Sequence, residues 1–89
     1  MNSPVRQLRE AWGLTISEFS EALGVQYNQA FQVEKGRQRL PRKAREALGE
    51  LGVDVADLER RQAEWIEERA RKLREELAGK IVVAGTVIA

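Results

Sequence analysis

Apolar residues recur at steps of three and four along the first half of the chain, separated by short breaks that contain glycine or proline. This spacing places side chains on one face of an α-helix. It predicts four short helices, over about residues 4–12, 15–23, 27–35 and 41–51. The expected inward positions, in chain order, are Val5, Leu8, Phe19, Ala22, Leu23, Ala30, Val33, Ala44, Ala47, Leu48 and Leu51.

Capping residues stand at the predicted helix ends. Ser3 precedes Pro4, and proline suits the first turn of a helix because the N–H groups there have no intrahelical acceptor. Thr15 and Glu18 have the spacing of a capping box. Gly36 can take the left-handed conformation that closes a helix. These signals predict where the short helices begin and end.

A long fifth helix is predicted from Asp54 or Asp57 to near Leu77. Its apolar stripe consists of Leu58, Ile66, Ala70, Leu73 and Leu77, with Trp65 beside it. A heptad counted from Leu58 and Trp65 places charged residues in the seam, namely Arg61, Glu68 and Lys72. We therefore expect a short, irregular packing face rather than a long parallel zipper.

The last residues, Ile81–Ala89, are rich in β-branched side chains and predict one strand or a tight hairpin. A bare apolar strand is unfavourable in water, so either a partner subunit covers it or it folds back on Trp65 and Ile66. The expected fold class is thus mostly α, with a compact four-helix block (1–53) followed by a helical extension and β-prone tail (54–89). The extension is the expected dimerisation region, through Trp65, Ile66, Leu73, Leu77, Ile81, Val83 and Val87.

Composition limits the possible chemistry. The 89 residues suffice for one small core and include neither cysteine nor histidine, which removes thiolate nucleophiles, histidine bases and the usual zinc ligands. No phosphate loop or metal-ligand cluster is present either, so we expect neither an enzyme nor a bound cofactor or metal. No apolar run approaches the roughly 20 residues that span a bilayer. We expect a cytoplasmic protein that does not enter the membrane.

Charge is concentrated in one place although the formal net charge is only +1. Six basic residues fall between positions 35 and 45 and no acidic residue separates them: Lys35, Arg37, Arg39, Arg42, Lys43 and Arg45. A basic run is usually a solvated face. Here it follows two short helices joined by a tight turn at Gly24 and Val25, which is the geometry of a helix-turn-helix.

Residues 8–53, LREAWGLTISEFSEALGVQYNQAFQVEKGRQRLPRKAREALGELGV, resemble the Cro and λ-repressor-like helix-turn-helix regulators, also called the xenobiotic-response-element family. The matching motifs are the LREAWGLT opening, the EALGV turn, the Glu34-Lys35-Gly36 step and Pro41 after the basic loop. The chain departs from the family's usual Gln, Ala, Ser and Ile or Val at Ile16, Ser20, Gln26 and Ala30. These departures concern base preference rather than the fold.

The resemblance implies a recognition helix over about residues 27–34 that enters the major groove. The implied base contacts are Gln26, Tyr27, Asn28, Phe31 and Gln32. Asn and Gln can bond an adenine edge in bidentate fashion, and an apolar ring can contact a thymine methyl group. Tyr27 and Phe31 are also consistent with core aromatics of a slightly rotated helix, and the sequence leaves both interpretations open.

Phosphate contacts are expected around this helix. Ser17 lies in the first turn of the second helix, where free N–H groups and the helix dipole favour an anion. The expected phosphate contacts are Ser17, Lys35, Arg37, Arg39, Arg42 and Lys43. Glu34, beside these cations, is interpreted as a structural ion pair or cap.

The sequence therefore predicts a sequence-specific regulator that binds double-stranded DNA, in the form of a homodimeric repressor on a palindromic operator. A homodimer is expected because one recognition helix contacts only a few base pairs. The alternative is a protein-interaction module on a helix-turn-helix scaffold, which uses the C-terminal extension to bind a partner such as a toxin, an antirepressor or a polymerase subunit.

Overall fold

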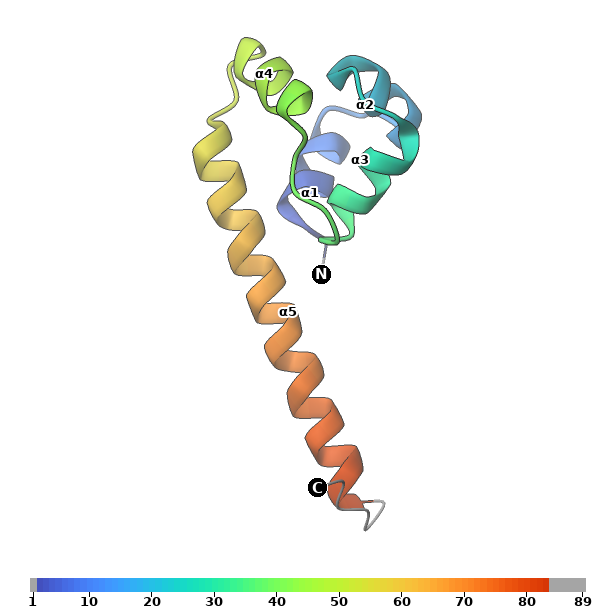
Figure 1. The fold of residues 1–89 in the computed structure, drawn as a ribbon, viewed down its shortest axis with the longest axis vertical. Coiled ribbons are helices and arrows are strands. Elements are labelled where there is room, and N and C mark those ends of the chain that lie inside the picture. The colour runs from blue at the N-terminus through green and yellow to red at the C-terminus, as the bar shows by residue number, and fades with distance from the viewer. Residues whose placement is uncertain (1, 84–89) are drawn as a thin grey trace.

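The computed structural model describes the backbone of residues 2–83 and the side chains of residues 2–80. Helices in this part of the chain are α1 (Pro4–Ala11), α2 (Ile16–Leu23), α3 (Tyr27–Glu34), α4 (Arg42–Glu50) and α5 (Val55–Val83). Figure 1 shows α1–α4 gathered into a compact head, while α5 runs along one side of it and then extends away. The predicted mostly helical fold with a long C-terminal helix is confirmed.

The first two helices begin at the predicted caps. The Ser3 hydroxyl accepts a hydrogen bond from the backbone N–H of Arg6 at 3.2 Å. In the capping box, the Thr15 hydroxyl accepts from the N–H of Glu18 (3.1 Å), and the Glu18 carboxylate accepts from the N–H of Thr15 (3.0 Å). Both caps satisfy N–H groups that have no acceptor within their own helix.

The core of the head lies between α1, α2, α3, α4 and the beginning of α5. Its buried apolar residues are Val5, Phe19, Leu23, Val33, Leu40, Ala44, Leu48 and Leu58. The expectation that Ala22 and Leu51 point inward is wrong, because both are exposed, Leu51 with 59% of its residue surface. Helix α4 ends at Glu50, and the N–H of Val53 donates to the Leu48 carbonyl, so that Val53 packs against the core in place of Leu51.

The beginning of α5 belongs to this core, although it lies beyond the boundary predicted after Val53. Leu58 is buried, and so is the polar side chain of Gln62. The Gln62 carbonyl oxygen accepts from the N–H of Val5 at 3.3 Å, and its amide nitrogen donates to the carbonyl of Val33 at 2.9 Å. One side chain thus joins α5 to both α1 and α3.

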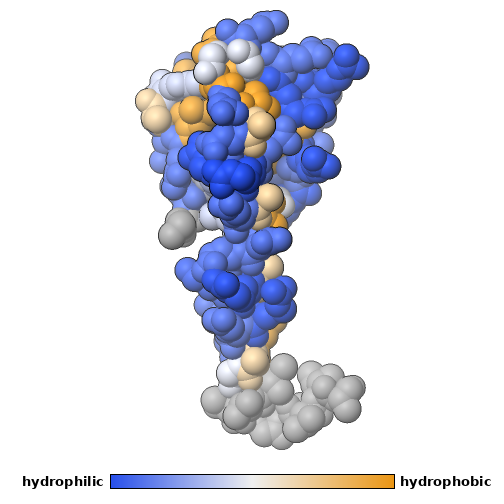
Figure 2. All heavy atoms as spheres, turned by 90° about the vertical axis from the view of Figure 1, so that its left-hand side faces the viewer, coloured by the Kyte–Doolittle hydropathy of each residue, from blue (hydrophilic) through white to orange (hydrophobic). Residues whose placement is uncertain are grey.

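Helix α5 leaves the head near Ile66 (Figure 1), and the Arg69 guanidinium still donates to the Lys35 carbonyl at 3.4 Å. Figure 2 shows mainly hydrophilic residues over the part of α5 beyond Ile66, with apolar residues along one edge. The predicted strand over Ile81–Ala89 is not confirmed, because the backbone of residues 81–83 continues α5, and Val87 with the other tail residues lies outside the described residues.

Candidate nucleic-acid interface

Helices α2 and α3 pack against each other across a tight turn. Gly24 ends α2 in the left-handed conformation (φ +68°), which a glycine adopts at little cost, and the N–H of Val25 donates to the Ser20 carbonyl at 3.0 Å. Helix α3 then buries Ala30, Val33 and Glu34 in the head. The opposite face of α3 is therefore exposed to solvent.

The N-terminal end of α3 holds three of the five predicted base contacts in exposed positions. Gln26 and Asn28 are exposed, and Tyr27 is 55% exposed. Tyr27 is thus a surface residue. The interpretation of Tyr27 as a core aromatic is excluded. Gln29, which sequence reasoning did not select, accepts a hydrogen bond from the N–H of Gln26 through its side-chain oxygen at 3.0 Å.

The other two predicted base contacts are half-buried. Phe31 and Gln32 lie on the flank of α3, between its buried and exposed faces. The ammonium group of Lys35 lies 5.4 Å from the centre of the Phe31 ring, a cation–π contact. Phe31 is thus neither a fully buried core residue nor a freely exposed side chain.

Basic residues of α4 lie close to amide side chains at the beginning of α3, and together they line a groove. It is lined by Gly24, Val25, Gln26, Gln29, Pro41, Arg42 and Lys43. Arg42 and Lys43 are exposed, and the Arg42 guanidinium also donates to Glu46 at 3.0 Å. Two predicted phosphate contacts therefore lie beside a predicted base contact more than a dozen residues away in sequence.

The N-terminus of α2 carries another predicted phosphate contact. Ser17 is exposed in its first turn. The hydrogen bonds from Thr15, first of all the one from its backbone N–H, lower the pKa of the Glu18 carboxyl and keep it ionised near the positive end of the helix. Its negative charge is used in capping, while Ser17 lies toward solvent.

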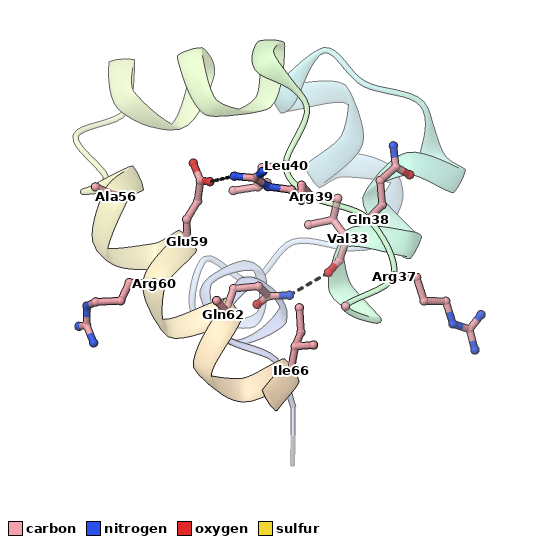
Figure 3. A pocket seen from close by; sticks show the side chains of 12 residues that line it. Val33, Arg37, Gln38, Arg39, Leu40, Ala56, Glu59, Arg60, Gln62 and Ile66 are labelled. Carbon is pink, nitrogen blue, oxygen red and sulfur yellow. Dashed lines mark hydrogen bonds and ion pairs between the residues drawn. The ribbon is translucent and has the colours of Figure 1, made fainter. Parts of the chain in front are cut away.

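The remaining predicted phosphate contacts do not join this groove. Arg37 extends into solvent from the loop after α3 (Figure 3). The side chain of Arg39 is 92% exposed and lies 3.9 Å from the carboxylate of Glu59 on α5. Together with Lys35 at the end of α3, these residues show that the basic run is spread over several sides of the loop.

A buried ion pair fixes α3 to α1. The Arg9 guanidinium donates to both carboxylate oxygens of Glu34, at 2.9 and 3.1 Å, and also to the Leu14 carbonyl at 2.8 Å. The side chains are only 11% and 3% exposed. Glu34 is thus part of a structural ion pair, one of the two roles expected for it. Arg9 and Gln62, which position α3, were not identified from sequence, since each is an ordinary polar residue in a helical pattern.

A second groove lies between the loop after α3 and helix α5 (Figure 3). Its volume is about 550 Å³. Its lining combines apolar residues, among them Val33, Leu40 and Ile66, with six polar ones: Arg37, Gln38, Arg39, Glu59, Arg60 and Gln62. Gly36 forms its end: a Cβ added at this residue would lie 2.8 Å from a ring carbon of Trp65 and 3.0 Å from a side-chain carbon of Ile66. The close approach of α5 to the loop therefore depends on glycine at position 36.

Residues 2–83 contain no cluster of acidic side chains arranged to hold a metal ion, and no helix in this range is long and apolar enough to cross a membrane. Comparison of the chain with protein-family models, with curated proteins and with solved structures gives no match. The resemblance to Cro-like regulators therefore remains a prediction from the motifs in residues 8–53.

Proposed function

We propose that this protein is a sequence-specific, double-stranded DNA-binding regulator of transcription, a repressor that acts as a homodimer on a palindromic operator. In this proposal α1–α4 form a λ-repressor-like helix-turn-helix block, and α3 is the recognition helix. Such a protein would act in the cytoplasm, at the nucleoid.

The observation that carries the proposal is the surface at the N-terminal end of α3. Gln26 and Asn28 are exposed amides beside the exposed ring of Tyr27, on a helix whose opposite face is fixed by the buried Arg9–Glu34 pair. Amides on a rigid helix suit base edges, because they supply a donor and an acceptor in a fixed plane. A rigid helix also keeps the entropy cost of binding low.

The groove that joins α3 to α4 supplies the second part of a DNA interface. Arg42 and Lys43 lie beside Gln26, and Ser17 lies exposed at the start of α2. Cations that flank base-reading residues neutralise phosphates and fix the helix in its groove without carrying sequence information. We assign Arg42, Lys43 and Ser17 to the central phosphate contacts. Lys35, Arg37 and Arg39 are assigned to the periphery.

A titration of the full chain against labelled random duplex DNA at two salt concentrations tests the proposal. We expect binding that weakens steeply with salt, because counterions are released from the DNA. Selection of bound fragments from a random library would then yield the operator. No binding at low salt would contradict the proposal and favour the protein-interaction module.

Two variants separate base contacts from phosphate contacts. Asn28→Ala should reduce discrimination between operator and random DNA by about 1 to 3 kcal/mol while leaving random binding nearly unchanged. The double variant Arg42→Ala with Lys43→Ala should weaken binding to both DNAs and reduce the salt slope by roughly one unit per lost phosphate contact. Gln38→Ala, an exposed amide in the loop, is the matched control and should change neither.

A further inference from the structure

Helix α5 carries one continuous inward stripe, of which the head covers only the first half. Leu58 and Gln62 are buried against the head, at 1% and 8% exposure. The same stripe continues to Ile66, Leu73 and Leu77, which are 38%, 49% and 56% exposed. The second half of the stripe is an apolar face on a charged helix. Ile66 is partly covered by the loop at Gly36, whereas Leu73 and Leu77 are about half exposed.

The exposed part of the stripe fits a short heptad in a register that avoids Trp65. Counting from Ile66 as position d gives alternating a and d positions, which are Ala63, Ile66, Ala70, Leu73, Leu77 and Lys80. Four consecutive positions, from Ile66 to Leu77, are apolar. The flanking e and g positions of this segment are all charged, namely Glu67, Arg69, Arg74 and Glu76.

We propose that this face binds the same face of a second copy of the chain, in an antiparallel two-helix seam centred between residues 71 and 72. In an antiparallel pair each a residue packs against a d residue of the other helix. Ile66 then packs against Leu77 of the second copy, and Ala70 against its Leu73. Two-fold symmetry repeats both contacts, so the seam has four apolar layers, and a small residue faces a large one in the two central layers.

The flanking charges select the antiparallel orientation. In an antiparallel seam g faces g and e faces e, so Glu67 meets Arg74 of the second copy. Arg69, which in the monomer donates to the Lys35 carbonyl at 3.4 Å and lies over the Trp65 ring, meets Glu76 of the second copy. Symmetry gives four attractive pairs in total. In a parallel pair each g position faces the e position five residues further along the other helix. Arg69 of each helix would then face Arg74 of the other, which gives two repulsive pairs. The same sequence thus favours one orientation by attraction and disfavours the other by repulsion.

The register of the seam is also determined by the sequence. A shift of one heptad toward the C-terminus places Ala70 opposite Lys80, and a shift toward the N-terminus removes Leu77 from the seam. In the proposed register, residues 81–83 of the second copy come level with residues 60–62.

The proposed pairing has a consequence for DNA binding, and this step rests on the proposed function. Gln62 holds the C-terminal part of α3, and the two copies of Gln62 would lie roughly 28 Å apart along the paired helices at about 1.5 Å per residue. Helix α3 runs from there away from the free end of α5 (Figure 1). The exposed N-terminal ends of α3 are therefore further apart than the two copies of Gln62, as separate half-sites on one face of DNA require.

Charge reversal at an exposed pair tests the seam without DNA. Within residues 2–80 neither Glu67 nor Arg74 forms an ion pair, so their substitution disturbs no other contact of this kind. Light scattering and sedimentation of the full chain, from micromolar concentrations upward, give the dissociation constant of the dimer. Arg74→Glu should weaken self-association roughly tenfold, since two exposed pairs become repulsive. Arg74→Glu combined with Glu67→Arg should restore it.

The opposite outcomes are equally clear. A parallel pair would be strengthened by Arg74→Glu, because the introduced carboxylate would then meet Arg69 of the other helix. A dimer that persists in Leu73→Glu, whose head should remain folded by circular dichroism, would place the interface elsewhere. A wild-type chain that stays monomeric at 100-fold higher concentration would overturn the proposal. Because no DNA is present, these results are independent of whether the chain binds DNA.

Discussion

The two halves of α5 differ in what surrounds them, although both are charged helix of the same kind. In the half that packs on the head, Leu58 is buried and both polar ends of Gln62 are hydrogen-bonded to backbone groups of other helices. In the free half, Leu73 and Leu77 are about half exposed, and the charged groups pair along the helix itself, as Arg71 does with Glu68. The side chains of α5 therefore contact other helices in one half, whereas in the other half they contact mainly neighbours within α5 itself.

This difference shows where the stability of the monomer resides. Exposed pairs along one helix contribute little, because water screens them and holding the side chains costs entropy. Burial of apolar surface and satisfaction of buried polar groups contribute much more. The head should therefore unfold as a cooperative unit that includes the first half of α5, and substitutions beyond Ile66 should hardly affect it.

The largest effect is expected from the buried ion pair. Arg9→Ala leaves the Glu34 carboxylate buried without its partner, which should destabilise the head by about 3 to 5 kcal/mol. Arg71→Ala removes an exposed pair with Glu68 on the free half and should leave unfolding almost unchanged. Urea unfolding followed by circular dichroism measures both. If Arg9→Ala and Arg71→Ala reduced the stability equally, the buried and the exposed ion pair would contribute alike, which contradicts this comparison.

Two leucines of the same helix give the next comparison. Leu58→Ala should destabilise the chain by about 2 to 5 kcal/mol, because it removes buried apolar surface and leaves a cavity. Leu73→Ala should change the stability of the monomer by less than about 0.5 kcal/mol, since this residue is half exposed. The measurement is urea unfolding at a protein concentration where light scattering shows the chain to be monomeric. A large loss in Leu73→Ala would show that the free half is packed in the monomer.

Glycine substitutions test the docking of α5 against the loop. Gly36 and Gly24 both have positive φ, +75° and +68°, so alanine is strained at either position. A Cβ at Gly36 also meets Trp65 at 2.8 Å, whereas nothing lies within 4 Å of one at Gly24. Gly36→Ala should therefore cost roughly 1 kcal/mol more than Gly24→Ala in unfolding experiments. Equal costs would mean that Trp65 moves freely away from the loop.

The smallest effect concerns the acid dependence of the cap on α2. The pKa of Glu18 is lowered in the folded chain, so its ionised form stabilises the fold at neutral pH, and this contribution is lost as the pH falls through the lowered pKa. Glu18→Gln should be slightly less stable than wild type at pH 7 and indistinguishable from it at strongly acidic pH. Glu21→Gln, on the same helix but outside the cap, serves as the control. If the stability difference between wild type and Glu18→Gln grew as the pH falls, it would contradict a stabilising role of the ionised carboxylate.

Short-range sequence features determined most of the local structure. Ser3, Thr15 and Glu18 define helix starts through hydrogen bonds within three residues, and a glycine closes each turn where φ must be positive. The periodicity likewise predicts the long helix and most buried positions. The predicted surface at the beginning of α3 follows from the same pattern, since the face opposite Ala30 and Val33 must be exposed.

Only the tertiary structure decided which long-range partners these elements find. Arg9 meets Glu34, Gln62 meets Val5 and Val33, and Arg42 lies beside Gln26, although nothing in the spacing of these residues distinguishes them from solvated polar positions. Helical periodicity reports which face of a helix is apolar, because that depends on neighbours three and four residues away. It carries no information about which other helix lies against that face, because that depends on how all five helices share one core.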